Sequence, residues 1–400
     1  MNISLLLGIL PPQHYDDIIK SSKGSIQYAA DALQKSIITG LALWCNSMSI
    51  INLPYIGSYP KRYLTYRIES YDFEYNAGQR IVRGKNIGFC NLSGFKMFSR
   101  YLNAYNALME SRVDNQVLLI YAIHTPFLLA AVRYKKKYPN VKIVLVVPDL
   151  PEYMSQTSSF LLNILGSFNQ RMLNSLYKNV DGWVLLSQHM KDRLPIKDNS
   201  YTVMEGIYNQ ADATYESQHY LTGRYVLYTG TLAKRYGILN LLKAFMNVKF
   251  TDVKLVICGS GDTSDEIIKA SYKDPRIIYK GLVKREEALM LQQNATLLVN
   301  PRTPEGEFTK YSFPSKTMEY LASGVPTLLY RLPGIPSEYY DYCFSLTDLS
   351  ISALTEKLNE ILEMSPYTLN DIGKRAKDFI CENKSPLKQT QKIIELIKQL

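Results

Sequence analysis

The segment Asn300–Pro333 has the sequence NPRTPEGEFTKYSFPSKTMEYLASGVPTLLYRLP. Apolar runs at Thr296–Pro301 and Pro326–Tyr330 are typical of short buried strands, and the stretch between them carries a helix that opens near Pro314. Proline suits a first helical turn because its missing N–H would have no intrahelical partner there. A strand, a helix and a second strand in this order predict one repeat of an α/β domain.

The same alternation extends through most of the chain. Apolar runs separated by helical stretches, without polar–apolar alternation, predict parallel strands buried on both faces. Further strands are predicted at Ile3–Gly8, Gln116–Ile123, Lys142–Asp149, Gly182–Ser187, Tyr225–Leu232, Val253–Gly259 and Arg276–Val283. Helices are predicted at Ser25–Ile38, Phe127–Lys137 and Ser158–Lys178.

The strands fall into two series, so two doubly wound, Rossmann-like α/β domains are predicted. We expect the first domain at 1–207 and the second at 208–383, with the polar stretch Gln210–Gly223 as linker. A last helix at 384–400 lies outside the second series and is expected to cross back to the first domain. Ligands of open α/β sheets bind beyond the carboxyl ends of the strands, so the site is expected where the two domains face each other.

Composition limits the classes of function. The chain of 400 residues is 46% hydrophobic and carries a net charge of +10. This balance favours phosphate-bearing partners, but no zinc spacing or nucleic-acid module accompanies it, so no nucleic acid is expected. The basic run Arg133–Lys137 has two open interpretations, a solvated helix end or a membrane-facing patch. Five widely spaced cysteines suit a reducing cytoplasm.

The helix that opens near Pro314 carries three polar residues in its first turns. Ser315 lies where free backbone N–H groups make an anion site, and Lys316 adds a positive charge beside it. Glu319, about one turn further on, is an acceptor suited to binding hydroxyl groups such as those of a ribose.

The stretch MEYLASGVP resembles the donor-site motif of glycosyltransferase family 4, whose members are retaining enzymes of the GT-B fold. The resemblance places Glu319 at the ribose-binding glutamate and implies two facing Rossmann-like domains. The family's first glutamate falls on Tyr311, a departure that leaves Glu307 as the candidate for the sugar contact. The helix start Pro314–Lys316 resembles that of bacterial capsular and exopolysaccharide glycosyltransferases.

The segment YVLYTGTLAKRYGILNLLKAF, which starts at Tyr225, resembles the family's phosphate-binding segment. Gly230 allows close backbone approach to a diphosphate. Thr231 stands where the family has arginine, and a tyrosine replaces the family lysine. Lys234 and Arg235 are therefore the candidates for stabilising the charge that builds on the leaving diphosphate.

The order of the remaining family segments implies two more donor contacts. Gly259, in VKLVICGSGD, falls at a strand-end turn, and Val283 falls where the nucleobase meets backbone.

In the first domain, the resemblance places His124 at the family histidine near the donor sugar and the acceptor. A neutral imidazole there can hydrogen-bond a hydroxyl. Lys23, Gly24 and Ser25 resemble the family's glycine-containing loop, and Asp149 follows a strand at the same expected edge. These four residues are the acceptor-side candidates.

The resemblance implies a retaining transferase that moves a sugar from a nucleotide diphosphate, with UDP favoured, to a hydroxyl of a glycan or polyprenyl-linked oligosaccharide in surface-polysaccharide assembly. No metal and no cofactor is expected, because the sequence has no Asp-x-Asp motif and no His/Cys cluster. A cytoplasmic enzyme, peripheral at the inner face of an anionic membrane, is the hypothesis for its location. Two alternatives stay open, namely a non-catalytic subunit that binds acceptor or a partner transferase, and a sugar-nucleotide epimerase.

Overall fold

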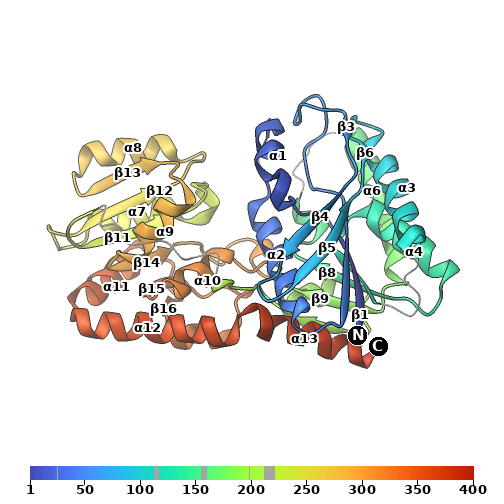
Figure 1. The fold of residues 1–400 in the computed structure, drawn as a ribbon. Coiled ribbons are helices and arrows are strands. Elements are labelled where there is room, and N and C mark those ends of the chain that lie inside the picture. Colours follow the sequence, from blue (N-terminus) through green and yellow to red (C-terminus); the bar gives the residue numbers. More distant parts are fainter. Residues whose placement is uncertain (25, 112–116, 155–159, 198, 211–220) are drawn as a thin grey trace. The chain divides into compact units, whose positions relative to one another are not determined.

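The computed structural model describes residues 1–24, 26–111, 117–154, 160–197, 199–210 and 221–400. The chain divides into two compact units (Figure 1). Unit 1 comprises Met1–Ile207 together with Pro386–Leu400, and unit 2 comprises Tyr208–Ser385. Most of the predicted linker, at 211–220, lies outside the described residues.

Unit 1 is built on a mainly parallel sheet with helices on both faces. Its strands are β1 (Asn2–Leu7), β2 (Ser47–Asn52), β3 (Arg67–Ile68), β4 (Tyr71–Asn76), β5 (Ile81–Asn86), β6 (Phe89–Cys90), β7 (Val117–Tyr121), β8 (Lys142–Val147), β9 (Gly182–Leu185) and β10 (Tyr201–Val203). Its helices are α1 (Tyr15–Ser21), α2 (Tyr28–Ala42), α3 (Lys96–Ser111), α4 (Thr125–Lys137), α5 (Pro151–Met154), α6 (Phe160–Tyr177) and α13 (Pro386–Gln399), with short 3₁₀ turns η1 (Pro12–His14) and η2 (Gln188–Arg193).

The main sheet of unit 1 has eight strands in the order β10-β9-β8-β7-β1-β2-β5-β4. All neighbours are parallel except β4 and β5, which form an antiparallel hairpin at the edge. This edge hairpin is absent from the sequence-based prediction of parallel strands. Buried and exposed residues alternate along β4 and β5, as expected for an edge with one solvated face.

The C-terminal helix α13 packs on unit 1, as predicted. It lies against α2, and Ile393 and Ile397 join Ile37 and Leu41 in one core on that face of the sheet. Burying a side chain of this size contributes about 1.5–3 kcal/mol relative to leaving it exposed. The helix therefore completes the core of a unit from which it is remote in sequence.

Unit 2 contains a second, wholly parallel sheet in the order β13-β12-β11-β14-β15-β16. Its strands are β11 (Tyr225–Thr229), β12 (Lys254–Cys258), β13 (Ile277–Gly281), β14 (Leu297–Asn300), β15 (Thr327–Tyr330) and β16 (Phe344–Leu346). Its helices are α7 (Ile238–Met246), α8 (Ser264–Lys273), α9 (Arg285–Gln293), α10 (Ser315–Ala322), α11 (Ile351–Glu363) and α12 (Pro366–Asn383), with 3₁₀ turns η4 (Lys234–Tyr236), η5 (Glu307–Thr309) and η6 (Ser337–Tyr342).

The strand β11 shows why unit 2 needs helices on both sides of its sheet. Val226 and Tyr228 point into one apolar core, whereas Tyr225 and Leu227 point into the other. Successive strand residues face opposite sides, so a wholly apolar strand must be covered twice. The predicted pattern of buried parallel strands is confirmed here.

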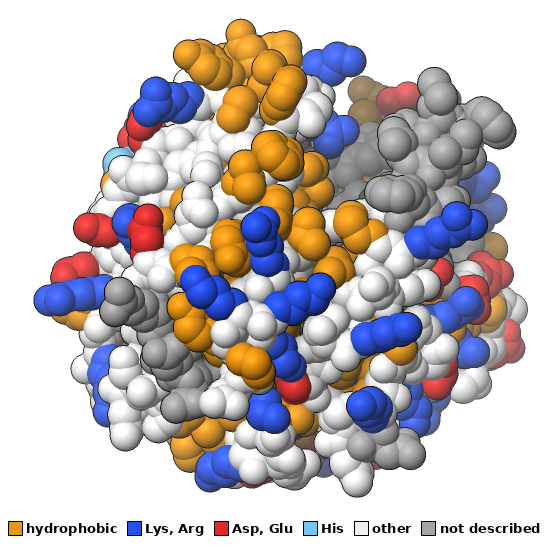
Figure 2. All heavy atoms as spheres, turned by 90° about the vertical axis from the view of Figure 1, so that its right-hand side faces the viewer, with side chains coloured by type: hydrophobic (Ala, Val, Ile, Leu, Met, Phe, Trp, Pro, Cys, Tyr) orange, Lys and Arg blue, Asp and Glu red, His pale blue; other side chains and the backbone are white. Residues whose placement is uncertain are grey.

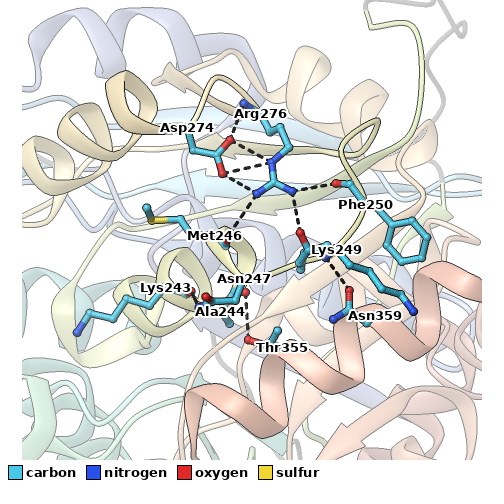
Figure 3. Close-up of polar contacts among 11 residues, drawn as sticks. Lys243, Ala244, Met246, Asn247, Lys249, Phe250, Asp274, Arg276, Thr355 and Asn359 are labelled. Carbon is cyan, nitrogen blue, oxygen red and sulfur yellow. Dashed lines mark hydrogen bonds and ion pairs between the residues drawn. The ribbon is translucent and has the colours of Figure 1, made fainter.

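Arg276, at the start of β13, ties the end of α7 to the sheet (Figure 3). Its guanidinium donates to Asp274 at 2.7 Å and to the carbonyl oxygens of Val248 at 2.9 Å and Phe250 at 2.8 Å. These bonds from Arg276 lower the pKa of Asp274. Because both side chains are largely buried, this pair is a structural clamp and not a loose surface contact.

The five cysteines, among the residues that the structure describes, are all free thiols. Within the same residues, no helix is long and apolar enough to cross a membrane.

Candidate functional site

Glu319 is the centre of a polar network in unit 2. It lies on α10, and its Oε1 accepts hydrogen bonds from Lys316 Nζ at 2.6 Å and from Gln292 Nε2 at 2.7 Å. Arg285 lies 3.7 Å from the other carboxylate oxygen, Oε2. The side chain is 20% exposed, so solvent still reaches it. Lys316, expected beside a diphosphate, is thus placed against Glu319.

The charge state of Glu319 follows from this network. Burial alone would raise its pKa, but Lys316, Gln292 and Arg285 outweigh burial and hold the pKa below the ordinary value. The side chain is therefore a carboxylate at neutral pH. Since Oε1 already has two donors, Oε2 is the oxygen that can accept hydroxyl groups from a ligand.

A buried second layer supports Glu319. Gln292, which is fully buried on α9, donates to Thr229 Oγ1 at 3.0 Å as well as to Glu319. The Tyr320 hydroxyl accepts from the Thr229 backbone N–H at 2.7 Å. This layer fixes the end of β11, where the chain enters the turn at Gly230. Neither Gln292 nor Tyr320 is among the sequence-predicted site residues.

The turn at Gly230, predicted to approach the diphosphate, lies in contact with the predicted strand-end turn at Gly259. The Gly230 N–H donates to the Cys258 carbonyl at 3.0 Å, and the Gly259 N–H donates to the Gly281 carbonyl at 2.7 Å. A Cβ on Gly259 would lie 1.8 Å from the Gly230 carbonyl oxygen, and the backbone of Gly259 has a φ of +136°. Only glycine fits this approach.

Basic and aromatic side chains gather next to the Gly230 turn. Lys234 and Arg235 are exposed on η4. The Arg235 guanidinium lies 5.1 Å from the Tyr236 ring centre, and Arg302 lies 5.5 Å from the same ring. Arg302, which follows β14, was not singled out from the sequence. It brings a second guanidinium to the tyrosine that stands in place of the family lysine.

The other predicted donor-side residues lie on separate segments of unit 2. Thr231 is exposed, and its carbonyl oxygen accepts from the Tyr228 hydroxyl at 2.8 Å. Val283 is half-buried and packs against the core that contains Tyr320. Ser315, the first residue of α10, and Glu307 in η5 are exposed.

In unit 1, His124 lies between β7 and α4. The turn that places it includes Ala122, a non-glycine residue with a φ of +67°. The imidazole packs edge-on against Phe127, with ring centres 4.4 Å apart, and against Tyr55 at 5.4 Å. Burial, Arg100 and Lys96 together hold the pKa of His124 well below its ordinary value. The ring is neutral at pH 7, and its buried Nδ1 has no hydrogen-bond partner among the described residues.

Arg100, on α3, is a second residue that sequence reasoning missed. It is 1% exposed and donates to the carbonyl oxygens of Leu53 and Pro54, each at 2.8 Å. The guanidinium also lies 5.0 Å from the Phe127 ring centre. Among the described residues, no carboxylate forms an ion pair with Arg100. Burial therefore lowers its pKa to about 10 and, with Arg100 nearby, that of Lys96 to about 8.

A small hollow lies beside Tyr55. It is lined in part by Gly8, Asp31 and Gln34. Gln34 accepts from the Gly8 N–H at 2.8 Å, and Asp31 accepts from the Leu10 N–H at 2.7 Å. These bonds fix the loop after β1. Because Tyr55 lines the hollow and also contacts His124, the two features form one continuous region.

The remaining acceptor-side candidates are peripheral to this region. Lys23 Nζ donates to the Pro60 carbonyl at 3.3 Å, and Gly24 is exposed nearby. Ser25 lies outside the described residues. Asp149 is exposed after β8, and its charge adds to burial and Tyr55 in raising the pKa of Tyr121.

Within the described ranges, no group of three or more His, Cys, Asp or Glu side chains is arranged to hold a metal ion.

Comparisons with known proteins bear on the family and the fold of the chain. Residues 210–379 match the family model described as "Glycosyl transferases group 1". The sequence has no match among curated proteins.

Three solved structures share the fold along the whole chain. The lipopolysaccharide outer core galactosyltransferase WaaB, in its apo form, has 13% identity and a TM-score of 0.59, with 100% of this chain and 99% of that chain covered. Sucrose-phosphate synthase from Thermosynechococcus elongatus has 13% identity, a TM-score of 0.63 and the same coverage. HepE from Anabaena, in complex with UDP and glucose, has 13% identity, a TM-score of 0.62 and 100% coverage of both chains.

Because their sequence identities to this chain are low, the solved structures show only its fold. The family match concerns residues 210–379, nearly all of which belong to unit 2. The prediction of a GT-B fold with two Rossmann-like domains is confirmed. Membership of family 4 and a role in capsule synthesis stay predictions. With a group 1 glycosyl transferase domain in unit 2 and the GT-B fold throughout, the chain is a glycosyltransferase.

Proposed function

We propose that this chain is a retaining glycosyltransferase that uses a nucleoside diphosphate sugar, with UDP as the nucleotide, and transfers the sugar to a hydroxyl of a glycan or lipid-linked oligosaccharide. The observation that carries this proposal is the Glu319 carboxylate. Lys316 and Gln292 hold it ionised, and Oε2 can accept from the two hydroxyl groups of a ribose.

The diphosphate is proposed to lie at the turns of Gly230 and Gly259. Transfer breaks the bond between the sugar C1 and the diphosphate oxygen and forms a bond from C1 to the acceptor oxygen, and the acceptor proton passes to the leaving phosphate. Negative charge builds on the diphosphate during this step. Arg235 and Lys234, with Arg302 behind them, are the cations proposed to stabilise it.

His124 is proposed to hydrogen-bond a sugar or acceptor hydroxyl as a neutral imidazole. Because its pKa is lowered, the imidazole carries no positive charge at neutral pH. It therefore orients a hydroxyl group and does not neutralise the phosphate charge.

The choice of UDP and of a glycan acceptor is supported by solved neighbours of the same fold. HepE is described in complex with UDP and glucose, and WaaB is described as a lipopolysaccharide galactosyltransferase. The WaaB description suits an enzyme of surface-polysaccharide assembly. The basic surface of unit 1 supports a place at an anionic membrane.

Calorimetric titration of UDP, GDP and ADP into the full chain tests the donor site. Micromolar binding of UDP is expected, and Glu319→Ala should weaken it on the order of 10- to 100-fold, because charge-assisted hydrogen bonds to ribose are lost. Glu356→Ala, on the exposed face of α11 in the same unit, is the matched control and should bind as wild type.

Product analysis then separates the three functional classes. Transfer to an acceptor with the anomeric configuration of the donor supports the proposal. Donor conversion without acceptor would identify an epimerase, and absence of nucleotide binding by folded protein would favour the non-catalytic subunit.

A further inference from the structure

Unit 1 exposes a group of large apolar side chains at one end. They are 37% to 63% exposed and come from the loop before β3 and from the segment that opens α3. We call this group the apolar tip, and it consists of Leu64, Tyr66, Leu92, Phe95, Met97 and Phe98.

The backbone that carries the apolar tip is well anchored. The Asn91 N–H donates to the Tyr66 carbonyl at 2.6 Å, and the Asn91 side chain donates to the Gly57 carbonyl at 3.0 Å. The Phe95 N–H donates to the Leu92 carbonyl at 3.0 Å. The apolar side chains are therefore held outward by an ordered backbone and are not the ends of a frayed segment.

Figure 2 shows one face of unit 1, with hydrophobic side chains gathered at its upper end and Lys and Arg side chains below them. In Figure 1, this upper end carries β3 and β6. Monomeric proteins seldom leave such a group uncovered without a binding role.

Charge around the apolar tip is mainly positive. The stretches 54–68 and 89–109, which carry the tip, contain five Lys or Arg residues and no Asp or Glu, although Arg100 is buried and Arg67 forms an ion pair with the adjacent Glu69 at 3.1 Å. Lys61 and Arg62 are exposed there. An interface with another protein usually has a rim of mixed polar groups, whereas apolar and basic groups together match an anionic lipid surface.

The outer face of α3 continues this character away from the tip. The Phe98 ring lies 6.4 Å from that of Tyr101, and Arg133 on α4 donates to the Tyr101 hydroxyl at 2.5 Å. The Arg133 guanidinium also lies 4.6 Å from the Tyr105 ring centre. Tyrosine and arginine, with apolar bodies and polar ends, suit the boundary between headgroups and acyl chains.

We propose that unit 1 docks onto an anionic lipid bilayer through the apolar tip, with Phe95 and Phe98 entering the acyl boundary and Lys61 and Arg62 meeting the headgroups. This inference gives the membrane association in the proposed function a defined surface, and it does not depend on the donor site in unit 2.

Vesicle flotation of the full chain tests the surface. Binding is expected to vesicles that contain phosphatidylglycerol, and not to pure phosphatidylcholine, and it should weaken as salt rises. The double variant Phe95→Ser/Phe98→Ser should bind at least 10-fold more weakly, because two aromatic side chains no longer enter the bilayer. Lys61→Gln/Arg62→Gln should weaken binding to anionic vesicles by about five-fold per charge removed.

Tyr272→Ser provides the matched control, since Tyr272 is an aromatic residue of unit 2 that is 87% exposed. It should bind vesicles as wild type does. Equal vesicle binding by wild type and both tip variants would overturn the proposal. It would also be overturned if the wild type bound no vesicles and formed a dimer, while the Phe95→Ser/Phe98→Ser variant was a monomer. UDP titration of the same samples keeps a failure of this surface distinct from a failure of the donor site.

Discussion

The candidate sites of the two units differ in how their buried charges are compensated. In unit 2, the Glu319 carboxylate is surrounded by Lys316, Gln292 and Arg285, so the charge is compensated before any ligand arrives. In unit 1, Arg100 is buried against carbonyl oxygens and aromatic rings, with no carboxylate ion-paired to it in the described part of the chain. Nearby, the His124 Nδ1 is buried and has no hydrogen-bond partner among the described residues.

This difference bears on how each unit meets its ligand. A compensated carboxylate is preorganised, so binding requires little rearrangement of its partners. Buried cations and an unsatisfied imidazole cost stability, and such groups are concentrated at binding sites. We infer that unit 2 presents a preorganised carboxylate, whereas the His124 Nδ1 of unit 1 gains a partner only from ligand or solvent.

The largest expected effect comes from the glycine contact that shapes the unit 2 site. Gly259→Ala should destabilise unit 2 by about 3 kcal/mol or more, since the new Cβ would meet the Gly230 carbonyl and the φ is unfavourable. Gly281→Ala is the control, because its φ of +67° is also left-handed but nothing lies within 4 Å, so only about 1 kcal/mol is expected.

Denaturant unfolding followed by two signals measures this change. Both tryptophans, Trp44 and Trp183, lie in unit 1, so their fluorescence reports that unit, whereas circular dichroism reports both. Only the dichroism transition should move in Gly259→Ala. A matching shift in the fluorescence transition would mean that the two units unfold together.

A clamp remote from the site gives the next largest effect. Arg276→Lys should cost roughly 2 kcal/mol of unfolding free energy, because lysine cannot hold Asp274 and the carbonyl oxygens of Val248 and Phe250 together. Arg375→Lys, in an exposed pair with Asp371, should cost less than about 0.5 kcal/mol. Similar losses in the two variants would mean that the clamp is ordinary surface charge.

The same clamp has a pH dependence of known sign. Bonds from Arg276 lower the pKa of Asp274 in the folded state. Its contribution to stability is therefore fully present above the unfolded pKa of about 3.9, and is lost as the pH falls further through the folded pKa. Asp274→Asn should remove this part of the acid dependence.

Gln292 tests the preorganisation of Glu319 directly. Gln292→Leu should weaken UDP binding by roughly 3- to 10-fold, since one buried donor to the carboxylate is lost, about 1 kcal/mol. Its neighbour Gln293 is exposed, and Gln293→Leu serves as the control. Calorimetry at neutral pH distinguishes them. If both variants bind as wild type, the network behind Glu319 has no part in donor affinity.

The smallest effect is spectroscopic. Because burial, Arg100 and Lys96 depress the pKa of His124, its imidazole resonance should not titrate between pH 5.5 and 8. Carbon-labelled histidine NMR, with His124→Gln to assign the signal, measures this. A midpoint near 6.5 would contradict the buried, cation-facing environment assigned to the ring.

The helix that carries three of the unit 2 candidates was predictable from sequence, because these residues are close together along the chain. Ser315, Lys316 and Glu319 occupy one helix start, and the strand–helix–strand pattern around them predicts that helix. Gln292 was not predictable in the same way. It reaches Glu319 from another helix, and nothing in its local sequence distinguishes it from the exposed Gln293.

In unit 1 the prediction was weaker, for a physical reason. Arg100 is a single arginine in a helix with many polar residues, and its burial depends on how α3 packs against α4. Burial of that kind is tertiary and leaves no periodic signal. The β4–β5 hairpin, in contrast, does have a sequence signal, the alternation of polar and apolar residues along Tyr71–Asn76. Arg302 has a weaker sequence signal, because it is a basic residue that closely follows a predicted strand.

The position of α13 has a consequence for the order in which the protein can fold during synthesis. A ribosome completes residues 1–207 first, but the helix that covers one face of that sheet begins only at Pro386. At ordinary elongation rates, this leaves the face uncovered for on the order of ten to forty seconds while unit 2 is made. The helix α13 therefore completes a unit whose sheet is synthesised before unit 2, and chaperone capture of the nascent chain should persist until that helix has emerged.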